Sequence, residues 1–226
     1  MKRLTLLMIL LGGILLTANG QPHGRLYLSD SFDLPLDTSK WIVETAPAPD
    51  SYVYTYNGRL VLDTKGGVTV WLNRKLKGNL HISFTRKVVM EGKVNDRLSD
   101  MNVFWMATDP RNGQLFTRNG VFEEYDSLSL YYVGMGGNTN TTTRFRRYDG
   151  NGKKPLLQEY LDAMHLLTAN KDYQIDITVK NGLVTFAVDN TVFFTYNDPE
   201  PLREGYFGFR STWSRQEIRN FKVSRL

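Results

Sequence analysis

The chain has 226 residues, no cysteine and a formal net charge of +5 at neutral pH. The absence of cysteine excludes thiol catalysis, cysteine–zinc sites and disulfide bonds, so the fold must depend on a hydrophobic core, for which this length is sufficient. The mild excess of positive charge is compatible with nucleic acid or with an acidic glycan as partner.

The first twenty residues have the pattern of a secretory signal peptide. Lys2 and Arg3 precede an almost unbroken apolar run over 4–16, and small residues follow at 18–20. This run is shorter than the roughly 20 residues of a membrane-spanning helix, and we expect no membrane span elsewhere. We therefore predict a cleaved signal at 1–20, a single domain at 25–226 and a periplasmic or secreted bacterial protein, since the absence of disulfides favours bacterial export.

Short strand-like runs recur along the remaining chain, separated by turn residues. They are predicted at 59–63, 68–72, 80–84, 173–179, 183–188, 191–194, 206–210 and 218–223. Only residues 156–167 could hold a short helix or helical turns. Many strands without alternating helices predict an all-β sandwich or jelly roll of two antiparallel sheets. Its core is predicted to contain Trp41, Trp71, Phe84, Phe186 and Phe207.

Residues 131–148 combine aromatic rings, glycines, hydroxyls and three arginines. Alternation along a strand places Tyr132 and Gly134 on one face, and on the returning strand Thr142, Arg144 and Arg146 share a face. Glycine weakens a strand unless something approaches its backbone closely. This face suits a flat, hydroxylated, acidic ligand such as a uronate or sulfated sugar; the alternative is a solvated hairpin.

Four segments carry a resemblance to a known family: NDRLSDMNVFWMATDP (95–110), EYD (124–126), residues 131–148 and GYFGFRST (205–212). Together they resemble a bacterial family of concanavalin A-like jelly rolls that occurs in gene clusters for degrading pectin-type and ulvan-type acidic polysaccharides. The resemblance covers residues 26–226. It implies a concanavalin A-like β-sandwich, and one member looks like a dehydratase of glucuronate–rhamnose oligosaccharides from ulvan, which would imply that activity here.

Two better-known enzyme groups of this fold fit less well. Retaining glucanases carry Glu-x-Asp-x-x-Glu, which supplies both catalytic carboxylates, whereas the segment beginning at Glu124 ends in Ser129. Alginate lyases carry Arg-Ser-Glu-Leu-Arg early in the chain and Gln-Ile-His later. Residues 215–219 imitate the first motif at the wrong end of the chain, and 174–176 lack the histidine.

Elimination from a uronate requires a base for the proton on C5, a cation for the carboxylate and an acid for the group that leaves C4. Tyrosine and histidine commonly serve as acid and base, and guanidinium captures carboxylates in a bidentate manner. We predict Tyr132, His165 and Arg144 as the catalytic residues. His165 is preferred to His81 because it lies in an irregular segment after the cationic hairpin; a structural histidine is the alternative for both.

Further residues are predicted to bind the substrate. Asp100 and Asn102 would project together from one strand, with an internal hydrogen-bond network as their alternative role, and Trp105 could stack on a sugar although alternation places it with core residues. The remaining candidates are Tyr125, Asn138, Thr142, Arg146 and Arg210. No spaced metal-ligand motif occurs, so we expect no catalytic metal and no cofactor; a structural calcium site on Asp96, Asp100 and Asp109 stays open.

The sequence thus predicts an exported carbohydrate-active protein. Its expected partner is an acidic oligosaccharide or polysaccharide, not nucleic acid, and its expected reaction is metal-independent β-elimination at C4–C5 of a uronate, as a dehydratase or polysaccharide lyase. A non-catalytic carbohydrate-binding module is the main alternative, and a glycoside hydrolase a weaker one. The polysaccharide and the oligomeric state stay open at this point.

Overall fold

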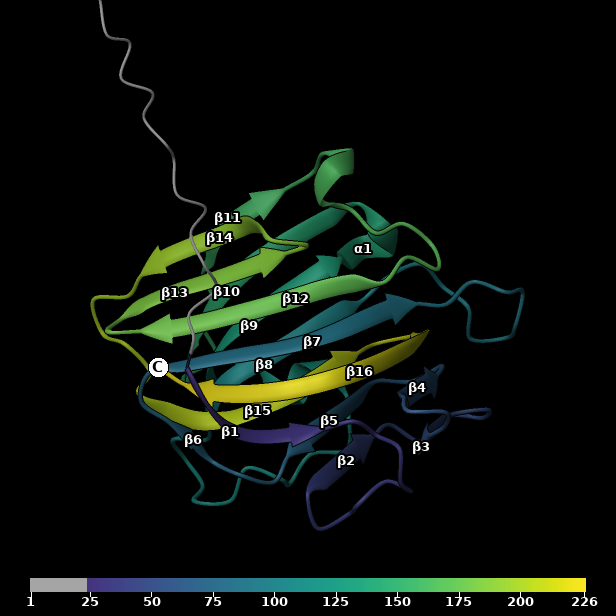
Figure 1. The fold of residues 1–226 in the computed structure, drawn as a ribbon, viewed down its shortest axis with the longest axis horizontal. Coiled ribbons are helices and arrows are strands. Elements are labelled where there is room, and N and C mark those ends of the chain that lie inside the picture. Colours follow the sequence, from purple (N-terminus) through teal and green to yellow (C-terminus); the bar gives the residue numbers. More distant parts are fainter. Residues whose placement is uncertain (1–23) are drawn as a thin grey trace, which may run out of the picture.

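A computed structural model describes residues 24–226, which form two eight-stranded antiparallel sheets packed face to face (Figure 1). The predicted signal peptide, residues 1–20, lies outside the described residues. The arrangement confirms the predicted β-sandwich of two antiparallel sheets.

The first sheet runs in the spatial order β14 (Thr191–Asn197), β13 (Leu183–Val188), β12 (Tyr173–Lys180), β7 (Leu80–Val88), β16 (Ser214–Arg225), β4 (Leu60–Thr64) and β3 (Tyr52–Thr55), with β1 (Arg25–Asp30) pairing with β16. The second sheet runs in the order β11 (Leu156–Tyr160), β10 (Thr142–Asp149), β9 (Ser129–Gly136), β8 (Met101–Thr108), β15 (Glu204–Ser211), β5 (Val68–Leu72) and β2 (Trp41–Thr45), with β6 (Leu76–Lys77) beside β15. Three short turns complete the described elements: the 3-10 turns η1 (Phe122–Tyr125) and η2 (Ala163–His165), and α1 (Gly137–Asn140) between β9 and β10.

The main hydrophobic core lies between the two sheets, and period-two alternation fills it. On β7, for example, Leu80, Ile82 and Phe84 are buried, whereas the residues between them are partly exposed. Four of the five predicted core residues belong to this core, namely Trp41, Phe84, Phe186 and Phe207. Trp71 is equally buried, but it belongs to a second cluster on the outer face of the second sheet.

This second cluster is covered by the connection between β8 and β9, residues 109–128, which we call the covering loop. Leu115, Tyr125 and Leu128 of the loop are buried against Trp71 and Phe104 of the sheet. Because the loop packs its apolar side chains onto the outer face of the second sheet, only the rest of that face stays accessible.

Residues 156–167 do not form the predicted helical segment throughout. Residues 156–160 are strand β11, which pairs with β10, and only residues 163–165 form the 3-10 turn η2. The side-chain amide of Gln158 donates to the carbonyl of Thr195 at 3.0 Å and accepts from its N–H at 3.3 Å. It thereby connects β11 with β14, the edge strands of the two sheets.

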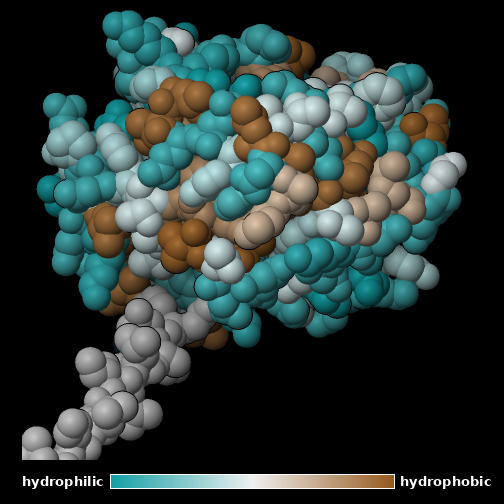
Figure 2. All heavy atoms as spheres, turned by 90° about the horizontal axis from the view of Figure 1, so that it is seen from above, coloured by the Kyte–Doolittle hydropathy of each residue, from teal (hydrophilic) through white to brown (hydrophobic). Residues whose placement is uncertain are grey.

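The molecule seen from above shows hydrophobic side chains in separate groups among hydrophilic ones (Figure 2). Within residues 24–226, Met164, Leu161 and Val192 are among the exposed large hydrophobic side chains. No helix in this part of the chain is sufficiently long and apolar to cross a membrane.

Candidate functional site

A pocket of about 360 Å³ opens on the part of the second sheet that the covering loop leaves free. We call it the sheet pocket. Strands β8, β9 and β10 form its floor, and loops form its rim. It is lined by Arg97, Asp100, Asn102, Phe122, Tyr132, Gly134, Gly137, Asn138, Thr142, Arg144, Arg146, Tyr148, Lys154 and Thr212.

Strand register explains why distant residues meet in this pocket. Directly paired residues form one row across the second sheet, in the order Thr69, Arg210, Asn102, Gly134, Arg144 and Glu159. The adjacent row on the same face contains Trp71, Gly208, Phe104, Tyr132 and Arg146. Because side chains two apart share a face, Tyr132 with Gly134 and Arg144 with Arg146 lie together, as alternation predicted.

Gly134 leaves the backbone of the pocket floor bare. A Cβ atom at this position would lie 2.1 Å from the hydroxyl of Tyr132 and 2.9 Å from Oδ1 of Asn102. The two polar groups therefore converge over the glycine, which gives a physical reason for glycine inside this strand.

The Tyr132 ring is held by aromatic neighbours while its hydroxyl stays unpaired. Ring centroids lie 5.6 Å from Phe104, 5.9 Å from Phe122 and 5.9 Å from Tyr148. The side chain is 8% exposed, and its hydroxyl has no hydrogen-bond partner within residues 24–226. A rigid phenol with a free hydroxyl is thus available to a ligand.

Burial raises the pKa of the Tyr132 phenol, and the nearby Asp100 carboxylate raises it further. The guanidinium groups of Arg210, Arg146 and Arg144 act in the opposite direction, but the pKa stays well above its ordinary value. Tyr132 is therefore protonated at neutral pH and can donate a proton or a hydrogen bond.

Two further polar groups on the floor lack partners in the described chain. Oδ1 of Asn102 and the hydroxyl of Thr142 are both buried and form no hydrogen bond within residues 24–226. Buried polar groups are usually paired, so these atoms indicate a surface prepared for ordered water or for a hydroxylated ligand.

The cations of the pocket differ in how they are paired. Arg144 forms an ion pair with Glu159 of β11. Nη1 of Arg146 donates to the carbonyl of Lys154 at 2.7 Å, and within the described chain no carboxylate forms an ion pair with Arg146. Lys154 is paired with Asp126 at 2.6 Å. Arg146 is therefore the cation most available to an acidic group of a ligand.

Asp100 provides a carboxylate at the other side of the pocket. Its Oδ2 accepts from Nη1 of Arg97 at 2.7 Å, and Nη2 of Arg97 donates to the hydroxyl of Thr139 in α1 at 3.2 Å. Asp100 has a left-handed backbone with φ of 63°. Its other oxygen, Oδ1, has no partner in residues 24–226, so it is free to accept.

The structure brings seven of the eleven predicted site residues into the sheet pocket: Asp100, Asn102, Tyr132, Asn138, Thr142, Arg144 and Arg146. Their predicted roles stay predictions. Sequence reasoning missed Tyr148, although alternation from Arg144 and Arg146 would have placed it on the same face. Lys154 was also not among the predicted site residues, and nothing in the sequence indicated that Phe122 forms a wall.

The placement of His165 and Trp105 in the site is wrong. His165 stacks on Tyr160 with ring centroids 3.7 Å apart, and its Nδ1 lies 2.8 Å from Asp162. Its carbonyl accepts from Thr143, which points to the opposite face of β10 from Arg144. Trp105 is fully buried in the core between the sheets, so it cannot stack on a sugar.

Arg210 lies on the same face of the second sheet as the pocket residues but beneath the covering loop, and Tyr125 belongs to that loop. Both side chains are fully buried, and neither lines the pocket. The hydroxyl of Tyr125 donates to Glu44 at 2.8 Å. The structure therefore does not bring these two residues to the surface of the sheet pocket.

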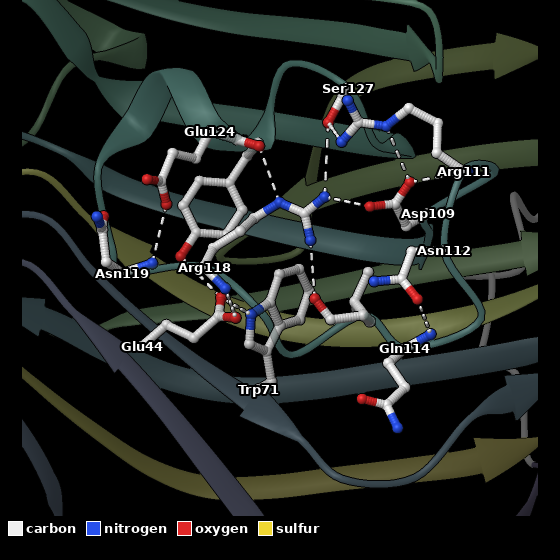
Figure 3. Close-up of polar contacts among 12 residues, drawn as sticks. Glu44, Trp71, Asp109, Arg111, Asn112, Gln114, Arg118, Asn119, Glu124 and Ser127 are labelled. Atoms are coloured by element: carbon white, nitrogen blue, oxygen red, sulfur yellow. Dashed lines mark hydrogen bonds and ion pairs between the residues drawn. The ribbon is translucent and has the colours of Figure 1, made fainter.

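Buried hydrogen bonds hold the covering loop on the sheet (Figure 3). The carboxylate of Glu44 on β2 accepts from the indole N–H of Trp71 at 2.7 Å, from Tyr125 at 2.8 Å and from the backbone N–H of Arg118 at 2.8 Å. Two of these donors belong to the loop, so one carboxylate connects the loop to the sheet.

Within the loop, Arg118 joins distant segments (Figure 3). Its guanidinium contacts Asp109 at 2.5 Å and the carbonyls of Leu115 and Glu124 at 2.8 Å each. These contacts fix the loop, and with it Phe122 at the wall of the sheet pocket.

A larger, more open hollow of about 820 Å³ lies along the covering loop. Its charged lining is largely engaged internally: Asp109 pairs with Arg111 and Arg118, and Asp126 pairs with Lys154. We therefore take the sheet pocket, with its unpaired polar groups, as the candidate site. No group of three or more His, Cys, Asp or Glu side chains in residues 24–226 is arranged to hold a metal ion.

Comparisons with known proteins agree with this architecture. A family model described as "Domain of unknown function (DUF6250)" matches residues 62–221. A search of curated proteins finds no match.

Among solved structures, a Bacillus subtilis protein of unknown function with a galectin-like fold is similar, with a TM-score of 0.74, 16% identity, and coverage of 89% of this chain and 96% of the other. The carbohydrate-binding module CBM66 from Bacillus subtilis has a TM-score of 0.57 at 10% identity, with 82% and 96% of the chains covered. An endo-β-1,3-glucanase from Pyrococcus furiosus has a TM-score of 0.63 at 10% identity, with 89% and 94% covered. At these identities the likeness establishes the jelly-roll fold alone.

Proposed function

We propose that the sheet pocket of this chain, which belongs to the DUF6250 family, binds an acidic oligosaccharide and catalyses β-elimination from a uronate. One observation carries the proposal. The free hydroxyl of Tyr132 and the free amide oxygen of Asn102 converge over bare backbone at Gly134, beside Arg146, which has no carboxylate partner in the described chain. Carbohydrate-binding modules and glucanases with the same fold support a saccharide ligand.

The lining residues offer each group that the reaction requires. Arg146, together with Arg144, would bind the uronate carboxylate and neutralise its negative charge, which makes the C5 proton more acidic. Oδ1 of Asp100 would accept that proton, and the electron pair of the C5–H bond would form the C4=C5 double bond. The C4–O bond then breaks, and the departing oxygen takes the proton of Tyr132.

This assignment replaces His165 as the base. The raised pKa of Tyr132 favours an acid role because the phenol holds its proton until the leaving oxygen develops negative charge. A dehydratase would release water from C4, whereas a lyase would release the next sugar, and both follow the same proton transfers.

The test uses glucuronate–rhamnose oligosaccharides as substrate. We expect the ultraviolet absorbance of an unsaturated uronate to rise; mass spectrometry then separates loss of one water from chain cleavage. Tyr132→Phe should retain binding and lose turnover, and Tyr52→Phe, which alters an exposed tyrosine on the first sheet, serves as matched control. Full turnover by Tyr132→Phe would refute the assignment of the acid.

A non-catalytic binding module is the second candidate, and a specific observation favours it. No histidine of residues 24–226 lines the sheet pocket, and the only carboxylate in its lining, Asp100, is already paired with Arg97. Calorimetric binding of the oligosaccharide without any new absorbance or mass change would select this function. In both cases Arg146→Ala should weaken binding of the acidic saccharide.

A further inference from the structure

Arg210 on β15 is a buried cation, and two of its nitrogen atoms lack hydrogen-bond partners in residues 24–226. Its side chain is 0% exposed. The centre of its guanidinium lies 5.1 Å from the ring centroid of Phe122 and 5.1 Å from that of Tyr125, so two aromatic rings of the covering loop contact it. In the cross-strand row it is the direct neighbour of Asn102, which lines the sheet pocket.

The hydrogen bonds of Arg210 engage only one of its three nitrogens. Nη1 donates to the carbonyl of Gly120 and to the hydroxyl of Thr69 at 3.3 Å. Nε and Nη2 have no partner in residues 24–226, and no carboxylate in that range forms an ion pair with this guanidinium. A buried charge without a counter-ion is costly, so its presence calls for an explanation.

Arg86, which is also buried, shows that this fold can satisfy such a group fully. Its Nε donates to Gln216 at 2.7 Å, Nη1 to the carbonyl of Asn102 at 2.6 Å and Nη2 to the carbonyl of Arg210 at 2.9 Å. Arg86 therefore connects the two sheets structurally. Arg210 has no comparable set of partners, which separates its role from that of a structural arginine.

Direct contact between Arg210 and a ligand is excluded by the loop above it. Phe122 covers the guanidinium, and Gly120 is tightly enclosed: a Cβ there would lie 2.4 Å from the carbonyl oxygen of Gly67 and 2.5 Å from the backbone N of Ala46. Because this segment fits so closely, the cation can act on the pocket only through its electric field. Burial weakens screening by salt and water, so the field reaches further than that of an exposed arginine.

We propose that Arg210 is a specificity-determining residue, which makes the sheet pocket select negatively charged saccharides over neutral ones without touching them. This inference rests on the proposed function. Gly134, at the centre of the pocket floor, lies two strands from Arg210 in the row, which corresponds to roughly 10 Å. A unit charge at that distance, in a medium of effective dielectric constant about 20, changes the affinity for a unit anion about 15-fold.

The experiment compares two ligands: a glucuronate–rhamnose oligosaccharide and the same oligosaccharide with its carboxylate reduced to the alcohol. In the Arg210→Met variant, we expect the ratio of the two affinities to fall about 15-fold, while the affinity for the neutral ligand stays unchanged. Arg210→Lys keeps the charge and should keep most of the selectivity. Arg219→Met removes a cation that pairs with Asp172 away from the pocket, and it should leave the ratio unchanged.

Thermal unfolding of each variant checks that the fold is intact. If Arg210→Met does not fold, Arg210→Gln carries the test, since it removes the charge but keeps a polar side chain. Unchanged selectivity in a folded, uncharged variant would overturn the inference. If the wild-type protein binds neither oligosaccharide, the proposed function fails; if it binds the acidic one and the variants retain that preference, only the role of Arg210 fails.

Discussion

Replacing Gly134 with alanine should disable the sheet pocket while leaving the sheet intact. The added Cβ would lie 2.1 Å from the Tyr132 hydroxyl, so that oxygen has to move about 1.3 Å to reach an ordinary contact of 3.4 Å. The ring cannot easily swing aside, because Phe104, Phe122 and Tyr148 surround it. Since a displacement of about 1 Å in a reacting group costs roughly 100-fold in rate, we expect a loss of that size in elimination.

The effect on stability should be much smaller. The backbone of Gly134 is not left-handed, so alanine is conformationally allowed and reduces the entropy of the unfolded chain. Overpacking typically costs about 1–3 kcal/mol, which corresponds to a fall of only several degrees in melting temperature for a domain of this size.

The assay measures initial rates by ultraviolet absorbance and affinity by calorimetry, with circular dichroism to follow melting. Gly113→Ala is the matched control, because a Cβ there meets no atom within 4 Å. If Gly134→Ala turned over substrate at the wild-type rate, the bare floor and the fixed Tyr132 hydroxyl would have no part in the reaction.

Two further predictions concern the covering loop. Glu44→Ala leaves two buried donors and one partly buried donor without an acceptor, so we expect a loss of roughly 3–5 kcal/mol and a fall in melting temperature of about 10 °C. Glu204→Ala, which removes exposed ion pairs, should change the stability little. For Asp109, burial raises the pKa, but hydrogen bonds from the Arg111 backbone and from Arg118 outweigh it and hold the pKa below its ordinary value. This stabilisation is present above the unfolded-state pKa and is lost as pH falls below about 4 through the lower folded pKa. Chemical denaturation should therefore show Asp109→Asn destabilised at pH 7, with the difference from wild type shrinking toward pH 3; a constant difference would contradict the linkage.

Alternation accounts for what the sequence could predict. A strand has a side-chain period of two, so Tyr132 with Gly134, and Arg144 with Arg146, had to share faces once β9 and β10 formed a hairpin. The same rule kept Trp105 among core residues, and its assignment to sugar stacking went against that pattern. Strand positions and the sandwich followed from local turn signals in the same way.

Long-range placement accounts for what the sequence could not predict. His165 follows the cationic hairpin in the chain, yet β11 carries it past the edge of the sheet to the opposite side of β10. Arg210 faces the same side of the second sheet as Asn102, but its burial depends on Phe122 from a loop about ninety residues earlier. Loop packing has no periodicity, so no pattern in the sequence reveals it.

The side-chain amide of Gln158 has a consequence for how the molecule meets other copies of itself. An exposed edge strand offers N–H and C=O groups that invite a foreign strand to add to the sheet. Gln158 occupies both groups of Thr195 on β14, in the manner of a short piece of backbone. Gln158 of β11 therefore blocks this part of the β14 edge from pairing with a strand of another molecule.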